Sequence, residues 1–319
     1  MKKTLLPLLV MVMMMAGNNS YATKWRVNNT GIQADFTWAY QMVNSSLVQS
    51  GDTVYFESSA SNYGNISGLS KRLVIIGPGY FLGENDSTQA NIQPAMLDNL
   101  EFNNGSQGSV IKGMTVSSWT SLSTSNITLE RNYLGSISIN NGNGHVIIRN
   151  YIASLTIYAG NNILIANNIV IRTGSNSYPS ISMNAQGSAI IENNIFLGFV
   201  YISNSIFRNN ICWSNDPTYS FMPNNCKWEN NISAGTMLGS TNGNQQNVDM
   251  NSVFLMTGST DGKYSLKPGS PAIGAGGNGT DCGVFGGNYP YVLSGMVAGP
   301  SVYYLYMDGN DVTVKAKSH

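Results

Sequence analysis

The stretch Arg131-Asn132-Tyr133-Leu134 decides the fold, because it returns four times in close variants: Arg149-Asn150-Tyr151-Ile152, Asn167-Asn168-Ile169-Val170, Asn193-Asn194-Ile195-Phe196 and Asn209-Asn210-Ile211-Cys212. A sixth copy, Asn230-Asn231-Ile232-Ser233, differs only at its end. The second Asn of each copy forms a series with spacings of 18, 18, 26, 16 and 21 residues: Asn132, Asn150, Asn168, Asn194, Asn210 and Asn231. A period near 20 residues with β-branched flanks predicts stacked coils of parallel strands.

Aligning the coils on this Asn sorts the neighbouring positions into columns. We expect two core columns, one three residues before the Asn and one directly after it: Leu129, Ile147, Ile165, Ile191, Phe207 and Trp228, then Tyr133, Tyr151, Ile169, Ile195, Ile211 and Ile232. The position four residues before the Asn should point outward, yet Val146, Leu164, Ile190 and Ile206 are apolar there. An exposed stripe of this kind indicates either cover by the C-terminal region or a contact surface.

The Asn series itself is expected to be structural. A stacked Asn at a tight turn can adopt the left-handed or bridge conformation, bond nearby backbone groups and bond the Asn of the next coil. We therefore assign Asn132, Asn150, Asn168, Asn194, Asn210 and Asn231 to architecture and not to chemistry.

The ends of the chain predict export and capping. A basic start, an apolar run from Leu5 to Ala16 and small residues at Ser20 and Ala22 are typical of a secretory signal peptide over residues 1–22. Helical spacing between Thr30 and Val48 predicts an amphipathic helix near 30–48 that caps the first coil, with Thr30 and Gln33 as a capping box. Residues 289–319 read as a strand-rich appendage or cap.

Composition limits the partners. Charged residues make up only 10% of the chain, and 16 acids balance 16 bases, so no field would attract nucleic acid or an anionic membrane. No second apolar run is long enough to span a bilayer. The odd cysteine count leaves at least one thiol without a partner in the chain, while Cys212 and Cys226 either form a disulfide or remain separate.

Beyond the repeat, two segments resemble secreted proteins of the right-handed parallel β-helix, or pectin-lyase-like, fold. Residues Gly51 to Phe56 and Lys71 to Gly79 are similar to the first coils of that group, and Pro268-Gly269-Ser270-Pro271-Ala272-Ile273-Gly274-Ala275-Gly276 is similar to a closing motif of bacterial exported members. The resemblance implies an all-β, right-handed parallel β-helix over residues 23–288, with the capping helix, in a secreted, periplasmic or cell-surface protein. It does not imply one function, because the scaffold carries many.

The regular coils lack most of the side chains that the known enzymes of that fold would need. No Asp lies between Asn99 and Asn215, and Glu130 and Glu192 are placed three coils apart, about 14 Å, which is too far for a pair of carboxylates acting on one glycosidic bond. The carboxylates that a Ca²⁺-dependent lyase would need to hold its ion are also missing. A metal-independent lyase could use Arg131 and Arg149, which occupy matching positions on adjacent coils. His145 falls in an interior column, and no second His stands beside it for a nucleophile relay.

Two functions remain from the sequence. The first is a non-catalytic exported protein, either a surface or matrix module or a polysaccharide-binding one, with Tyr158, Tyr178, Tyr201 and Trp213 as candidate sugar contacts. The alternative is a polysaccharide lyase or related carbohydrate-active enzyme acting on an acidic glycan, with Arg131 and Arg149 at its site. Neither requires a metal or another cofactor, and the oligomeric state is left open. The 26-residue step between Asn168 and Asn194 predicts a protruding loop around Gly174 to Pro179, where binding residues are expected.

Overall fold

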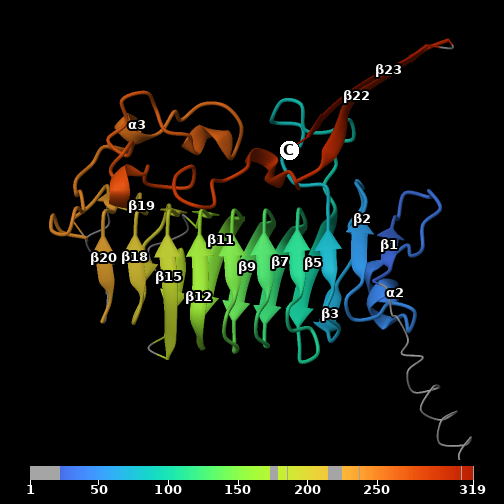
Figure 1. Ribbon diagram of the computed structural model, residues 1–319, viewed down its shortest axis with the longest axis horizontal. Coiled ribbons are helices and arrows are strands. Elements are labelled where there is room, and N and C mark those ends of the chain that lie inside the picture. The colour runs from blue at the N-terminus through green and yellow to red at the C-terminus, as the bar shows by residue number, and fades with distance from the viewer. Residues whose placement is uncertain are drawn as a thin grey trace, which may run out of the picture.

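The protein is predominantly β, with two long parallel sheets and only two short α-helices in the part described (Figure 1). The computed structural model describes residues 22–172, 179–184, 186–214, 225–236, 238–309 and 311–318. The expected signal peptide, Tyr178 and nearly all of the loop around Gly174 to Pro179 lie outside these ranges. Within them, no helix is long and apolar enough to cross a membrane.

The chain passes alternately through the two sheets, and we call one such passage a coil. The ten-stranded sheet A runs in the order β1 (Lys24–Val27), β2 (Thr53–Phe56), β4 (Val74–Ile76), β6 (Val110–Lys112), β8 (Thr128–Glu130), β10 (Val146–Ile148), β12 (Gly160–Ala166), β15 (Gly187–Glu192), β18 (Ile206–Arg208) and β20 (Lys227–Glu229). The eleven-stranded sheet B consists of β3 (Ile66–Leu69), β5 (Met96–Phe102), β7 (Thr115–Leu122), β9 (Tyr133–Ile139), β11 (Tyr151–Ile157), β13 (Ile169–Val170), β14 (Ile181–Met183), β16 (Ile195–Phe196), β17 (Val200–Tyr201), β19 (Ile211–Cys212) and β21 (Ile232–Ser233). All pairings inside these two sheets are parallel.

The strand register confirms the alignment on the repeated Asn. Ile147 pairs with Leu129 on one side and Ile165 on the other, as the first predicted core column requires. Glu192 pairs with Ala166, which follows Ile148 and Glu130 in the same column, so Glu130 and Glu192 are indeed three strands apart. Parallel stacking therefore places equivalent residues above one another along the whole series.

One of the two predicted core columns was assigned to the wrong side of the sheet. The column three residues before the Asn lies in the interior, but Tyr151, Ile169, Ile195, Ile211 and Ile232 belong to a second apolar cluster outside it, together with Phe254, Tyr264, Ala272 and Val284 of the C-terminal region. The interior is filled instead by the next residues along the chain: Leu134, Ile152, Val170, Phe196 and Cys212. The C-terminal region thus covers this second column and not the apolar stripe Val146, Leu164, Ile190 and Ile206, of which Ile190 is 39% exposed.

The repeated Asn forms a continuous buried ladder. In the coil of Asn168, its Nδ2 donates to the carbonyls of Ile147 (2.8 Å) and Ala166 (3.0 Å) and to Oδ1 of Asn194 (3.0 Å). Its Oδ1 accepts from the backbone N and the Nδ2 of Asn150 (2.9 and 3.0 Å). The same pattern continues to Asn244, a member that the sequence repeat did not reveal.

The left-handed conformation falls one residue earlier than the Asn ladder. The residues with positive φ are the first members of each repeated dipeptide, at 55° to 59°: Arg131, Arg149, Asn167, Asn193, Asn209 and Asn230. Asn tolerates this region better than most residues, which accounts for its frequency there. We call this outward-facing series the clasp column.

The N-terminal cap differs from the prediction. The only helix there is α2 (Ala39–Asn44), and Thr30 and Gln33 do not form a capping box: the Thr30 amide and hydroxyl instead bond Oδ1 of Asn28, both at 2.7 Å. Part of the segment that was expected to be helical instead lies beside β1, where Phe36 forms an isolated parallel β-bridge with Val27. The strand β1 was not predicted, because it has only four residues and no repeated Asn marks it.

Two further features complete the chain. The helix α3 (Met250–Val253) begins the C-terminal region, which continues through 3₁₀ turns at Gly262–Tyr264, Gly277–Gly279 and Leu293–Gly295. Residues 300–318 form an antiparallel hairpin of β22 (Pro300–Asp308) and β23 (Asp311–Ser318). Cys212, Cys226 and Cys282 form no disulfide with a described residue, so Cys212 and Cys226 are not joined by the disulfide that the sequence left open.

Candidate functional site

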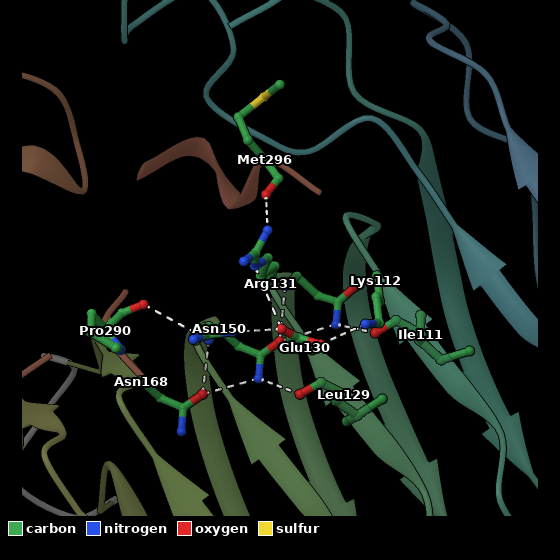
Figure 2. A network of polar contacts seen from close by, with 11 residues as sticks. Ile111, Lys112, Leu129, Glu130, Arg131, Asn150, Asn168, Pro290 and Met296 are labelled. Carbon is green, nitrogen blue, oxygen red and sulfur yellow. Dashed lines mark hydrogen bonds and ion pairs between the residues drawn. The ribbon is translucent and has the colours of Figure 1, made fainter. Parts of the chain in front are cut away.

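Arg131 and Arg149 lie on adjacent coils and converge on Glu130. Figure 2 shows Arg131 and Lys112 beside this carboxylate. Arg149 Nη1 is 2.9 Å from Glu130 Oε1, and Lys112 Nζ is 2.8 Å from Oε2. Arg131 Nε lies 3.6 Å from Oε1, an ion-pair distance that is too long for a hydrogen bond. Three cations therefore share one carboxylate.

The ionisation of this cluster follows from its neighbours. Burial opposes the charged form of Glu130, but the hydrogen bonds from Lys112 and Arg149 and the charges of Lys112 and Arg131 outweigh it and hold the pKa of Glu130 below its ordinary value. Burial is also the main reason why the pKa of Arg131 is lowered, although the guanidinium remains charged at neutral pH. Glu130 and Arg131 are thus both ionised at neutral pH.

Both arginines are also bound to the C-terminal strap, which we define as residues 276–297. Arg131 Nη1 donates to the carbonyl of Met296 (2.5 Å), and Arg149 Nε donates to the carbonyl of Pro290 (3.1 Å). Their guanidinium groups therefore already have anionic and carbonyl partners. They are poorly placed to neutralise a uronate, which would have to displace these contacts.

Three further members of the clasp column, Asn167, Asn193 and Asn209, also hold the strap through their side chains. Asn167 Nδ2 donates to the carbonyls of Val284 and Gly286 (2.8 and 2.7 Å), and Asn193 Nδ2 donates to that of Asp281 (3.0 Å). Farther along, the Gly277 amide donates to Asn209 Oδ1 (2.9 Å). The strap consequently runs across successive coils in the direction opposite to their order in the chain (Figure 1).

A buried cluster of hydrogen-bonded side chains fixes the C-terminal end of the strap. The hydroxyls of Tyr80 and Tyr291 are 2.5 Å apart, and Asp261, fully buried, accepts from the amide of Ser294 at 2.7 Å and from Nδ2 of Asn85 at 3.0 Å. Burial raises the pKa of both tyrosines well above the ordinary value. These phenols remain neutral hydrogen-bonding groups and serve to anchor the segment.

The open site lies next to the strap, at the end of sheet A near β20. A cavity of about 530 Å³, which we call the cleft, is bounded by the clasp column, by three charged side chains and by strap residues. Its lining comprises Glu192, Asn193, Arg208, Asn209, Glu229, Asn230, Gly276, Gly277, Asn278, Thr280, Gly287 and Asn288. No aromatic ring is among these residues.

The three charged groups stand in one column on adjacent strands. Register places Arg208 between Glu192 and Glu229, so the two carboxylates are separated by two strand spacings, about 10 Å. Arg208 Nε and Nη2 both bind Oε2 of Glu192, at 2.8 and 2.7 Å. Glu229 Oε2 is paired with the exposed Lys227 at 2.9 Å.

Several polar atoms of the cleft are open to solvent and form no hydrogen bond with another described residue. They are Oε1 of Glu192, Oε1 of Glu229, Nη1 of Arg208 and the side-chain amide of Asn230. Acceptors and donors therefore alternate along the wall. A ligand with many hydroxyl groups could bond to several of them at once, since each hydroxyl both donates and accepts.

In the described part of the chain, no three His, Cys, Asp or Glu side chains are grouped closely enough to hold a metal ion. The charges also balance locally, because Arg208 and Lys227 offset Glu192 and Glu229. Neither a cation nor an acidic polymer would gain a net attraction there.

The candidate sugar contacts are dispersed. Tyr158 and Tyr201 are 49% and 46% exposed, and neither lines the cleft. Trp213 stacks on Phe254 with ring centroids 5.3 Å apart and belongs to the second apolar cluster. His145 is fully buried, within 3.4 Å of the Ile127 amide, in agreement with its assignment to the interior.

Sequence reasoning missed Glu229 and the cleft it helps to form. Glu229 holds the position two residues before Asn231, which Glu192 occupies before Asn194, so the alignment contained the signal. The strap could not be placed in this way, because it binds the clasp column mainly through its own main-chain carbonyls, which leave no trace in the sequence.

No protein-family model, no curated protein and no solved structure matches the chain.

Proposed function

We propose that this chain is an exported, right-handed parallel β-helix protein of the pectin-lyase-like kind, and that it binds a neutral glycan in the cleft. The observation that carries the proposal is the set of unpartnered donors and acceptors on Glu192, Arg208, Glu229 and Asn230 within one cavity. Alternating parallel sheets and the resemblance of its first coils and closing motif support the fold assignment.

The ligand class follows from charge and shape. The balanced charges favour a neutral sugar over a uronate, and the rigid coils hold the polar groups at fixed spacing. Because no aromatic ring lines the cleft, we expect a single cleft to bind a glycan weakly. A glycan with repeated units that engages several copies of the protein would bind more tightly. This is the behaviour of a surface or matrix module.

The lyase alternative has less support. Arg131 and Arg149 are bound to Glu130 and the strap, and among the described lining residues Arg208 is the one cation in the cleft. Arg208 would have to release Glu192 to neutralise an acidic substrate. A carboxylate beside the scissile bond would also repel a uronate.

The test is binding to a panel of neutral and acidic oligosaccharides, measured by calorimetry, with Arg208→Ala and Glu229→Gln. Each lost charge-assisted bond should weaken binding by roughly ten- to a hundredfold. Arg26→Ala is the matched control, because Arg26 of β1 forms a similar Arg–Glu pair, at 2.5 Å, with Glu57, which directly follows β2 and lies far along the molecule from the cleft.

The proposal would be refuted if the folded wild-type protein bound none of the neutral oligosaccharides. It would also be refuted if both cleft variants bound them as tightly as the wild type does. An assay for unsaturated uronate products on acidic polysaccharides addresses the alternative. Cleavage that Arg208→Ala abolishes would establish a lyase in place of a binding module.

A further inference from the structure

The hairpin formed by β22 and β23 extends away from the rest of the molecule (Figure 1). Its hydrogen bonds to other described residues lie near its base, where the Ala90 amide donates to the carbonyl of Val302 (2.8 Å) and the Ser301 hydroxyl donates to that of Thr88 (2.7 Å). An isolated two-stranded ribbon is marginally stable in water. A projecting hairpin of this length is therefore expected to have a further partner.

One face of the hairpin is apolar and uncovered. Cross-strand pairs put Leu305 opposite Val314 and Met307 opposite Val312, and these four side chains are between 54% and 67% exposed. On the other face, Tyr304 stacks with Tyr306, and the Lys315 ammonium lies 5.0 Å from the Tyr304 ring centroid. The two faces thus differ as they would in a sheet with one side against a partner.

The outer edge of β23 is also open, since β22 is its one strand partner among the described residues. Such an edge presents unpaired backbone groups to another strand. Its charges are ordered, with Asp311 at the tip end and Lys315 and Lys317 at the base end. When two copies of the strand lie antiparallel, the acidic end of each therefore faces the basic end of the other.

We propose that β23 pairs with β23 of a second copy of this chain, in antiparallel register about Val314. In this register Val314 faces its own counterpart, Val312 faces Ala316, and Asp311 faces Lys317 of the other copy. The result is a two-fold symmetric, four-stranded antiparallel sheet. Its apolar face is continuous across the junction, and both charged ends are matched.

A second copy fits the edge better than a lipid surface does. Asp308 and Asp311 are cross-strand neighbours at the tip of the hairpin, so insertion into a bilayer would carry two carboxylates in first. Pairing with a second copy leaves Asp308 in water and places Asp311 beside a cation.

Crosslinking through Val314→Cys tests the register. Facing residues of antiparallel strands have Cα atoms about 4.5 to 5.5 Å apart, within the range of a disulfide. We expect oxidation of the full-length protein to give a covalent dimer. The control is Leu305→Cys, which is similarly exposed on the same face but lies on β22, away from the two-fold axis.

The charge order is tested by sedimentation of Asp311→Lys, Lys317→Asp and the double exchange. Each single change puts like charges opposite one another twice per dimer and should raise the dissociation constant roughly tenfold, while the double exchange should restore it. Equal crosslinking of both cysteine variants, or a single species of monomer mass at every concentration, would overturn the proposal. So would binding to phosphatidylcholine–phosphatidylglycerol vesicles by a protein that stays monomeric.

Discussion

The Asn ladder makes a quantitative prediction at Asn168. Alanine there removes the acceptor of the Asn150 amide and the donor to the Ile147 carbonyl, both of which are buried. A buried polar group left without a partner costs about 1–3 kcal/mol, so Asn168→Ala should lower the free energy of unfolding by about 4 kcal/mol. For a chain of 319 residues, that corresponds to a fall in Tm of about 6 °C.

Asn161→Ala is the matched control. Asn161 lies in the same coil but is exposed, and its Oδ1 accepts only from the Ser188 hydroxyl at 3.0 Å. We expect a change within about 0.5 kcal/mol, as for most surface substitutions. Urea unfolding should be followed by both circular dichroism and tryptophan fluorescence, because stacked coils need not unfold in a single step.

A local measurement shows whether the ladder is the cause. Asn168→Ala should accelerate hydrogen exchange of the Asn150 amide more than that of amides several coils away. Equal stabilities of the Asn168→Ala and Asn161→Ala proteins would refute the reasoning. It would mean that the ladder follows from the fold without stabilising it.

Three further predictions concern the strap, pH and the thiols. Arg149→Ala removes contacts to Glu130 and the Pro290 carbonyl, so limited proteolysis should cut the strap several-fold faster; unchanged cutting would show that the clasp column does not hold it. Burial lowers the pKa of His145 below 6.5, despite hydrogen bonds that raise it, so the folded state disfavours protonation and stability should fall as pH drops through and below 6.5. His145→Gln should flatten that part of the stability profile relative to wild type, and an identical slope would contradict the assignment. In the native protein a thiol reagent should label the half-buried Cys226 before the two buried cysteines, whereas equal rates would indicate local opening.

The sequence repeat predicted the stacking because the same Asn occupies the same position in every coil. Register, the interior column through Ile147 and the burial of His145 all follow from that alignment. The error at Tyr151 and Ile169 arose because an apolar column can be buried from either side of a sheet. Periodicity alone does not distinguish an interior from a surface that another segment covers.

The candidate site was less accessible to prediction. The sequence identified Arg131 and Arg149 as cations at matching positions. Their ion pairs with Glu130 and their hydrogen bonds to the strap, however, depend on contacts between distant parts of the chain. The cleft depends on the same segment, since Gly276 and Gly277 form part of its wall. Loops that bond through main-chain atoms are positioned by packing, which a single sequence does not encode in readable form.

The reverse course of the strap has a consequence for how the protein assembles and fails. Coils that contact only their neighbours can melt from either end like an unzipping stack. Here the strap, which follows these coils in the chain, binds them from Asn209 back to Arg131, so each of its contacts requires that a much earlier coil has already formed. A defect in one middle coil should therefore destabilise both ends of the stack, and loss of the strap should turn a cooperative structure into a row of semi-independent units.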